Sequence, residues 1–487
     1  MTHDVYQEPL VGRYTQKAMQ QIFSDDFKFS TWRKCWTWLA EAQQELGIER
    51  ITDSMIDEMI KHQKTIDYAN AKAYEKKKRH DVNAHIAEYG DHCPQGKDII
   101  HLGATSMYVC DNTELIQMRE AMKVVKTGLV NCIHNMSQVA YEYKDLVTLG
   151  YTHFQPAQPT TVGKRFTLYL QDLLDDLEVI EGIEFKARGG KGTTGTQASF
   201  LDLFEGDYEK VKRLDQLVTE KMGFDRSYAV TGQTYPRKFD AKIAQALANT
   251  GISLYRFAQD TRLLAKDMIV DEPFEIDQTG SSAMPYKRNP MRSERMCGFV
   301  RKLCGLVPNF YDTAKSQWLE RTLDDSAIRR MDIPQSFLLT DGILILANNI
   351  TDRNVNLEKM RPMTFYPKRI EKLLNEKLPF MASEAIMIDL VKEGFNRQEM
   401  YEFIRKHSVD SAIAMKEEGA DCDLFERLGK DQNFPLSEKE LNAYLGNPLR
   451  FAGAANIQTE EFLEDYVKPA LEKNRHLIGK ASSEVNV

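Results

Sequence analysis

Apolar residues recur at helical spacing over unusually long stretches of this chain. The longest pattern starts at Leu115 and continues to Val139 in alternating steps of three and four residues, which is the period of a helix buried along one face. It predicts a helix of about seven turns. Helices of this length bury their stripes only against other long helices, so the middle of the chain is predicted to form an elongated bundle. Similar stripes cover residues 160–183, 237–268, 336–349 and the stretch that follows Asn289 and Pro290.

Glycines and prolines divide the rest of the chain into shorter segments. We expect an N-terminal helical domain over residues 1–110, a central long-helix domain over 111–356 and a C-terminal helical domain over 357–487. Ser437 and Glu440 have the spacing of a capping box, which predicts a helix start. Because alternating strand patterns are nearly absent, the predicted fold class is all-α. Several long helices are apolar on more than one side, which favours a homo-oligomer built on bundle faces.

Composition narrows the class of protein further. The chain has 487 residues, of which 42% are hydrophobic and 28% charged, so disorder and a small disulfide scaffold are excluded. The net charge of −8 argues against general binding to nucleic acid. The first residues lack a secretory pattern and the most apolar stretch contains Asp341, so we expect a cytoplasmic protein without membrane contact. The seven cysteines form no CxxC pair, and no zinc or other metal site is predicted.

The most unusual segment is the loop over residues 278–290, which contains GSSAMPYKRNP and lies between two predicted long helices. Its serines, its two cations and the following helix N-terminus suit an anion such as a carboxylate. We expect Asn289 to cap that helix and Pro290 to take its first position. The alternative is a polar connector without function.

This loop resembles the signature loop of the fumarase/aspartase superfamily, and its SAMPYKRNP form is closest to the adenylosuccinate lyases. The resemblance covers essentially the whole chain and implies a three-domain fold, a homotetramer and active sites that each draw on three subunits. Further stretches that agree with the family are RHDV at 79–82, GATS at 103–106, GYTHFQPAQ at 150–158, KGTTGT at 191–196, TGQTY at 231–235 and ERTLDDS at 320–326 with Arg330.

The resemblance implies catalytic roles for five residues. Ser281 would be the general base, with Lys287 and loop N–H groups stabilising its alkoxide. His153 would be the general acid, oriented by Glu294. His80 would be the second active-site histidine. Without the family motif, a loop serine is more often a turn residue, and His80 could belong to a solvated helix face that continues the preceding basic run.

The resemblance also implies substrate contacts. Arginine and hydroxyl groups suit a nucleotide phosphate, and Ser326 and Arg330 share one face if they lie on a helix. The alternative is an ordinary surface cluster. The proposed phosphate contacts are Arg13, Tyr14, Arg321, Ser326 and Arg330, and the other proposed substrate contacts are Arg79, Asp81, Thr105, Ser106, Thr152, Gln233, Ser282, Asn289 and Arg295.

The expected activity is a β-elimination that releases fumarate without a cofactor. The resemblance implies two substrates, adenylosuccinate, which gives AMP, and SAICAR, which gives AICAR. One alternative is another fumarate-releasing lyase such as argininosuccinate lyase. Another is a non-catalytic, crystallin-like structural protein on the same scaffold. The glycine-rich KGTTG stretch does not fit a nucleotide P-loop, because Phe185 stands where the first glycine belongs.

Overall fold

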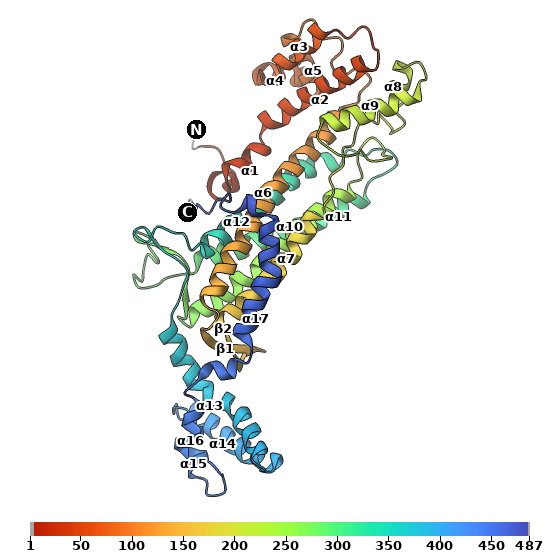
Figure 1. Cartoon of the computed structure of the whole chain (residues 1–487). Helices are drawn as coiled ribbons and strands as arrows, with labels where there is room; N and C mark the ends of the chain where they lie inside the picture. The colour runs from red at the N-terminus through yellow and green to blue at the C-terminus, as the bar shows by residue number, and fades with distance from the viewer. Residues whose placement is uncertain (1–3, 486–487) are drawn as a thin grey trace.

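The computed structural model describes residues 4–485, and its helices are arranged along one long axis (Figure 1). N-terminal helices form one end, a bundle of helices forms the middle, and a group of C-terminal helices forms the other end (Figure 1). The predicted all-α class is confirmed. The N-terminal elements are η1 (Leu10–Tyr14) and α1 (Lys17–Ile22), which pack on the bundle, and α2 (Asp25–Glu45), α3 (Asp53–Lys61), α4 (Tyr68–Lys78) and α5 (Asp81–His92).

Five long helices form the predicted bundle, and all five expected stripes lie on them. The helix α12 contacts α6, α10 and α11, and every residue from 336 to 351 of α12 is buried. Its apolar residues on several sides are therefore covered within one chain. The five helices are α6 (Ser106–Glu142), α7 (Val162–Glu181), α10 (Lys238–Lys266), α11 (Met291–Lys315) and α12 (Asp325–Thr351).

Two of these helices begin earlier than the hydrophobic pattern indicated. The first turns of α6 bury polar side chains instead of an apolar stripe: Asp111 pairs with Arg237 and Asn112 bonds to the backbone of Gly189. In α12, Pro334 lies inside the helix and interrupts the pattern that would otherwise reach back to Asp325. Hydrophobic periodicity finds a helix only where the buried face is apolar.

Short antiparallel strands also occur, and the largest pair is a hairpin of β1 (Val147–Thr152) and β2 (Gln155–Thr161). It was not predicted, because Gly150, Pro156 and Pro159 hide the strand pattern. The other pairs are β3 (Val270–Asp271) with β6 (Thr364–Phe365) and β4 (Phe274–Glu275) with β5 (Met360–Arg361). These two pairs lie beside the loop of residues 278–290.

The C-terminal helices pack in two different places. Helices α13 to α16 carry a hydrophobic cluster of their own that includes Ile386, Leu424 and Leu441, whereas α17 packs on α7 and the following turns pack on α6. The predicted capping box of Ser437 and Glu440 is confirmed at the start of α16. The elements are α13 (Pro367–Lys392), α14 (Arg397–Glu417), α15 (Leu424–Lys430), α16 (Glu438–Tyr444), η2 (Pro448–Ala452), α17 (Ala455–Phe462), η3 (Leu463–Val467), α18 (Lys468–Lys473) and η4 (Arg475–Leu477).

Two short helices, α8 (Ala198–Leu203) and α9 (Tyr208–Lys221), complete the chain between α7 and α10. They lie next to the N-terminal end, where α9 packs on α2 (Figure 1).

Candidate active site

The loop of residues 278–290 folds back on itself around Ser281. The Ser281 Oγ accepts hydrogen bonds from the backbone N–H groups of Ala283, at 3.3 Å, and Met284, at 3.1 Å. Two donors aimed at one oxygen favour its negatively charged form. Gly280 is required for this turn, since a Cβ there would lie 2.1 Å from the carbonyl oxygen of Lys287. The local backbone therefore supplies part of the stabilisation that an alkoxide base needs.

The end of the loop differs from the prediction. Helix α11 starts at Met291 with Pro290 as its N-cap residue, so the expected positions of Asn289 and Pro290 are wrong by one residue. The Asn289 amide instead donates to the carbonyl oxygen of Gly280 at 3.1 Å. This bond ties the two ends of the loop together.

A cavity of about 1240 Å³ lies beside the loop and carries an excess of positive charge. Two acidic residues, Asp271 and Glu294, also line it. Clustered cations in a concave site attract a multiply charged anion. The cationic residues come from the end of α10, the loop, β5 and the first turn of α13, and they are Arg262, Lys266, Lys287, Arg288, Arg361, Lys368 and Arg369.

The two cations of the loop differ in their surroundings. Arg288 pairs with Asp271 at 3.2 Å, and the hydroxyl of Tyr366 donates to the same carboxylate at 2.7 Å. Within residues 4–485, Lys287 makes no ion pair, so its ammonium group is available to a ligand. Ser282 is exposed and makes no side-chain hydrogen bond in this part of the chain.

His153 occupies the tip of the β1–β2 hairpin. His153 and Phe154 form its two-residue turn, with φ of 53° and 59°, as a type I′ turn requires. The imidazole and the neighbouring Thr152 are exposed. In the described chain, no hydrogen bond or ion pair joins His153 to Glu294 or to Ser281. A hairpin tip presents its side chain outward, where a second molecule can reach it.

His80 and its neighbours form a compact group at the start of α6. The His80 Nδ1 accepts from the backbone N–H of Asn83 at 3.3 Å, and its Nε2 shares a hydrogen bond of 3.3 Å with the hydroxyl of Ser106. His80 therefore caps α5 rather than continuing α4, which ends at Arg79 in the left-handed conformation. Thr105 is the N-cap residue of α6.

Further predicted contacts join this group. Arg330 pairs with Asp81 at 2.8 Å. Burial raises the pKa of Asp81, but the N–H of Val82 and the charge of Arg330 outweigh burial and leave this pKa below its usual value. Ser326 lies in the first turn of α12, one turn before Arg330, as the spacing predicted.

Gln233 and Arg321 approach the same group from two loops. The backbone N–H of Gln233 donates to the carbonyl of Glu320 at 2.9 Å. The guanidinium of Arg321 bonds to Asp325 at 2.6 Å, and its second amino group lies 4.0 Å from the sulfur of Met107. Arg321 therefore stands beside the start of α6, next to the group around His80.

Arg13 and Tyr14 do not join the other predicted phosphate contacts within one chain. The guanidinium of Arg295 lies 5.3 Å from the centre of the Tyr14 ring, and the Tyr14 carbonyl is close to Gly342 of α12. Gly342 lies 12 residues beyond Arg330, which corresponds to about 18 Å along a helix. Tyr14 and Arg295 thus form a second group of predicted contacts.

The two predicted catalytic histidines lie far apart in the chain. Helix α6 has 37 residues and is about 55 Å long. His80 bonds to its first residue, and the hairpin that carries His153 follows its last turn. The hairpin lies at the end of the bundle opposite to α4 and α5 (Figure 1). One chain therefore does not bring the two histidines into one site.

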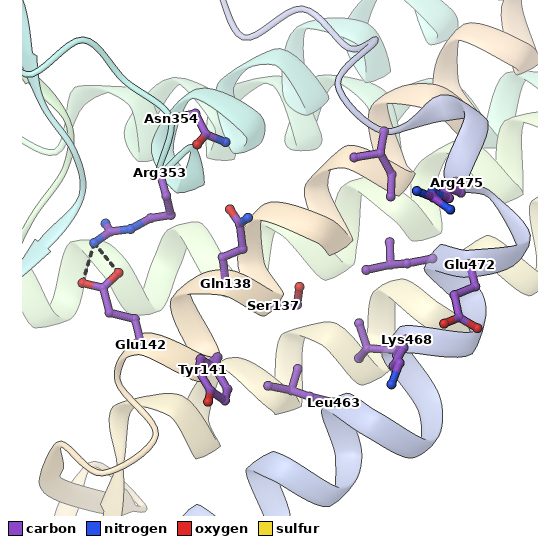
Figure 2. Close-up of a pocket in the computed structure, with 13 residues that line it drawn as sticks. Ser137, Gln138, Tyr141, Glu142, Arg353, Asn354, Leu463, Lys468, Glu472 and Arg475 are labelled. Carbon is purple, nitrogen blue, oxygen red and sulfur yellow. Dashed lines mark hydrogen bonds and ion pairs between the residues drawn. The ribbon is translucent and has the colours of Figure 1, made fainter.

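A separate cavity of about 600 Å³ lies between α6, the end of α12 and the C-terminal helices (Figure 2). Glu142 and Arg353 face each other across one side of it and form an ion pair (Figure 2). None of the site residues predicted from the sequence lines this cavity. Within residues 4–485, no group of three or more His, Cys, Asp or Glu side chains is placed to hold a metal ion, and no helix is long and apolar enough to cross a membrane.

Sequence reasoning missed a buried network of charges next to the His80 group. Arg237 and Asp325 are buried, and Arg237 bridges Asp111 at 3.0 Å and Asp325 at 2.8 Å. The signal was present in the sequence as charged residues at the ends of otherwise apolar helices. Nothing in the periodicity, however, says which distant charges meet.

Solved structures of other helical proteins share the fold of this chain. Over 96% of this chain and 98% of the other, it resembles the crystal structure of 3-carboxy-cis,cis-muconate lactonizing enzyme from Pseudomonas putida, with a TM-score of 0.77 and 21% identity. The crystal structure of a fumarate lyase from Mesorhizobium sp. BNC1 is similar, with a TM-score of 0.76 and 18% identity over 94% of this chain and 99% of that chain. At these identities the likeness shows the fold.

Sequence comparisons narrow the class to a family. Residues 2–305 match a family model described as lyase, and residues 379–462 match adenylosuccinate lyase C-terminus. Adenylosuccinate lyase of Saccharomyces cerevisiae is 46% identical over 100% of this chain and 99% of its own length, and that of Schistosoma mansoni is 44% identical over 96% of each. The chain belongs to the adenylosuccinate lyase family, as the sequence motifs predicted.

Proposed function

We propose that this protein cleaves adenylosuccinate to AMP and fumarate, and SAICAR to AICAR and fumarate. The observation that carries the proposal is the loop around Ser281, where two backbone N–H groups point at the hydroxyl oxygen and a cationic cavity lies alongside. Family membership supports the same activity. Both substrates carry a succinyl group on a nitrogen and a ribose phosphate, so one site can accept both.

The proposed mechanism needs one group that removes a proton from carbon and a second group that protonates the leaving nitrogen. Ser281, as alkoxide, takes the proton from the carbon next to the carboxylate, and the released electron pair spreads into that carboxylate. Lys287 stabilises the added negative charge. This electron pair then forms the double bond of fumarate while the C–N bond breaks. His153 donates its proton to the departing nitrogen. Glu294 would orient and charge the imidazole.

The remaining predicted residues bind the substrate. The group around His80, Ser106, Arg321, Ser326 and Arg330 combines hydroxyl and guanidinium donors, which suit a phosphate. Asp81 would position Arg330. The other expected contacts are Arg13, Tyr14, Arg79, Thr105, Thr152, Gln233, Ser282, Asn289 and Arg295.

We further propose that the active protein is a homotetramer whose sites combine residues of different subunits. The separation of His80 from His153 along α6 supports this, because a second chain packed against the bundle can bring one end next to the other. Three exposed apolar side chains on the long helices, Leu168, Ile252 and Met331, offer surface for such packing. The cytoplasmic location stays a prediction from the sequence.

A direct assay tests the activity. Purified protein is mixed with adenylosuccinate, and the ultraviolet absorbance is followed as AMP forms. Turnover of adenylosuccinate without an added cofactor is expected. No change with adenylosuccinate, or turnover of argininosuccinate instead, contradicts the proposal.

A mixing experiment tests the shared site. The variants Ser281→Ala and His153→Ala are each expected to be inactive and to remain tetrameric. After they are dissociated together and reassembled in equal amounts, about a quarter of the sites should hold both native groups if these come from different subunits. Activity near a quarter of the wild type is expected, and no recovery in confirmed mixed tetramers contradicts the shared site.

A further inference from the structure

The side chain of Arg321 is held by a carboxylate that has no contact with solvent. The Asp325 side chain has a relative exposure of 0%, and the same carboxylate accepts hydrogen bonds from Arg321, at 2.6 Å, and from Arg237, at 2.8 Å. Each of its oxygens serves one arginine. Asp325 therefore links a partly exposed guanidinium to one in the interior.

The interior end of this chain of charges is fixed by a second helix. Arg237 has no exposed side-chain surface and also pairs with Asp111 of α6 at 3.0 Å. The backbone N–H of Tyr235 donates to the same aspartate at 2.9 Å. Because α6 and α12 are both tied to Arg237, the Asp325 carboxylate has little freedom to move.

A neighbouring set of charges repeats this arrangement one turn along α12. Arg329 is buried and pairs with Asp240 and Glu114, each at 2.7 Å. The hydroxyl of Tyr235 donates to Asp240 at 2.5 Å. The network continues away from Arg321, so the wall behind Arg321 is rigid over several residues.

The charge state of Asp325 suits this role. Burial raises the pKa of its carboxyl, but the positive charges of Arg237 and Arg321 outweigh burial and leave this pKa below its usual value. The carboxylate thus stays ionised at neutral pH. The Arg321 side chain keeps a relative exposure of 17%, so part of its guanidinium remains accessible to a ligand.

We propose that Asp325 is a positioning residue for phosphate recognition, which it serves by fixing the plane of the Arg321 guanidinium before the substrate binds. A guanidinium recognises phosphate through parallel N–H donors, so its orientation matters as much as its charge. Fixing a side chain costs conformational entropy, and if the side chain is ordered before the substrate binds, this cost does not reduce the affinity. The inference rests on the proposed function, since the ligand is the phosphate that adenylosuccinate and SAICAR share.

A double-mutant cycle tests this coupling. Asp325→Asn should raise the KM for adenylosuccinate about 10-fold and change kcat by less than about 3-fold. In the Arg321→Gln background, the same replacement should change KM by less than about 2-fold, because the side chain that it positions is gone. With succinyladenosine, the substrate without its phosphate, Asp325→Asn should leave kcat/KM unchanged.

Two control variants separate positioning from stability. Asp423→Asn removes a partly exposed carboxylate at the start of α15. Asp423 pairs at 2.8 Å with Arg427, which is four residues away in the sequence, the same separation as between Arg321 and Asp325. This variant should leave KM unchanged. Glu88→Gln removes a fully buried carboxylate that pairs with Arg33. It should lower the unfolding temperature without raising KM.

The outcomes are distinct. If Asp325→Asn raises KM by the same factor with and without Arg321, or lowers kcat at constant KM, the inference is wrong. If Asp325→Asn does not fold, Asp325→Glu keeps the charge but moves the carboxylate, and its rise in KM should likewise vanish in the Arg321→Gln background. A wild-type protein without turnover overturns the proposed function. If the wild type is active and the effects of Asp325→Asn and Arg321→Gln on KM simply multiply, only the role of Asp325 is overturned.

Discussion

The two ends of the helical bundle hold different kinds of chemistry. At the start of α6 and α12, Arg321 and Arg330 are already paired with carboxylates, and a buried network stands behind Arg321. At the other end, Ser281 lies in a loop stabilised by its own backbone, and His153 projects from a hairpin tip without a bond to that loop in the described chain.

This difference matches what binding and catalysis require. A phosphate keeps its charge throughout the reaction, so the groups that hold it can be fixed in advance. A proton-transfer group must meet the substrate in the right geometry only when the site is complete. The rigid end is therefore suited to recognition, whereas the loop end suits groups that act only when substrate is bound.

The largest effect is expected from removing the proposed base. Ser281→Ala should lower kcat by at least about 1,000-fold, because no other hydroxyl receives the two N–H donors of the loop. The rate is measured with adenylosuccinate, and circular dichroism checks the fold. Thr279→Ala removes a hydroxyl two residues away and should stay within about 2-fold. A near-normal rate for Ser281→Ala would refute the assignment of the base.

A smaller but still large loss of activity is expected from replacing Lys287, the loop cation that makes no ion pair in the described chain. Lys287→Met should lower kcat about 100-fold, because the charge that develops on the carboxylate loses its partner. Lys266→Met removes a cation from the α10 wall of the same cavity and should mainly change KM. Equal losses of kcat in both variants would mean that the cavity acts only through its total charge.

The rigid end should respond to acid. Burial lowers the pKa of His101 to about 4, and its Nδ1 accepts a hydrogen bond of 2.8 Å from the indole of Trp36. The folded pKa lies below the unfolded value of 6.5, so this contribution to stability is complete above about pH 6.5 and is lost as the pH falls toward 4. Between pH 7 and pH 5, we expect a loss of about 2 kcal/mol in the free energy of unfolding per such group.

Urea unfolding at pH 7 and pH 5 measures this loss. His101→Asn should flatten the pH dependence, since asparagine tolerates the positive φ of 71° at this position. His85, whose pKa burial also lowers to about 4, remains in the variant, so part of the dependence should persist. An unchanged slope in the variant would show that His101 does not contribute.

The smallest effect is expected from the ion pair that holds the loop in place. Asp271→Asn weakens the contacts to Arg288 and Tyr366 and should change kcat/KM by about 3-fold, because an exposed pair contributes little. Asp277→Asn, one residue before the loop, is the matched control. A change of more than about 30-fold would mean that the loop end is also held rigidly.

Much of the fold could be predicted because it depends on local patterns. The stripe from Leu115 to Val139 and the other long stripes define the bundle helices, and the capping box at Ser437 marks a helix start. The hairpin that carries His153 was missed, because Pro156 and Pro159 suit an edge strand but hide its alternation. The start of α11 was misplaced by one residue: its N-cap residue is Pro290, and the Asn289 amide bonds to the carbonyl of Gly280.

The candidate site was predictable only as a set of residues. The family motifs name Ser281, His153 and Arg321 without saying which of them meet. Tyr14 was grouped with Arg330, whereas in the chain it packs against Arg295, on another helix. The contact between Asp325 and Arg237 was not predicted, because the two residues are 88 positions apart in the sequence.

The amino-acid sequence by itself determined the helical class, the positions of the long helices and the family. These properties depend on periodicity and on contiguous motifs, which a linear chain carries in full. Only the tertiary structure decided that the predicted site residues lie at two ends of one bundle and that Asp325 joins Arg237 to Arg321. Both facts depend on the lengths of rigid helices and on pairs of charges that are distant in sequence, and such contacts form only when the chain packs.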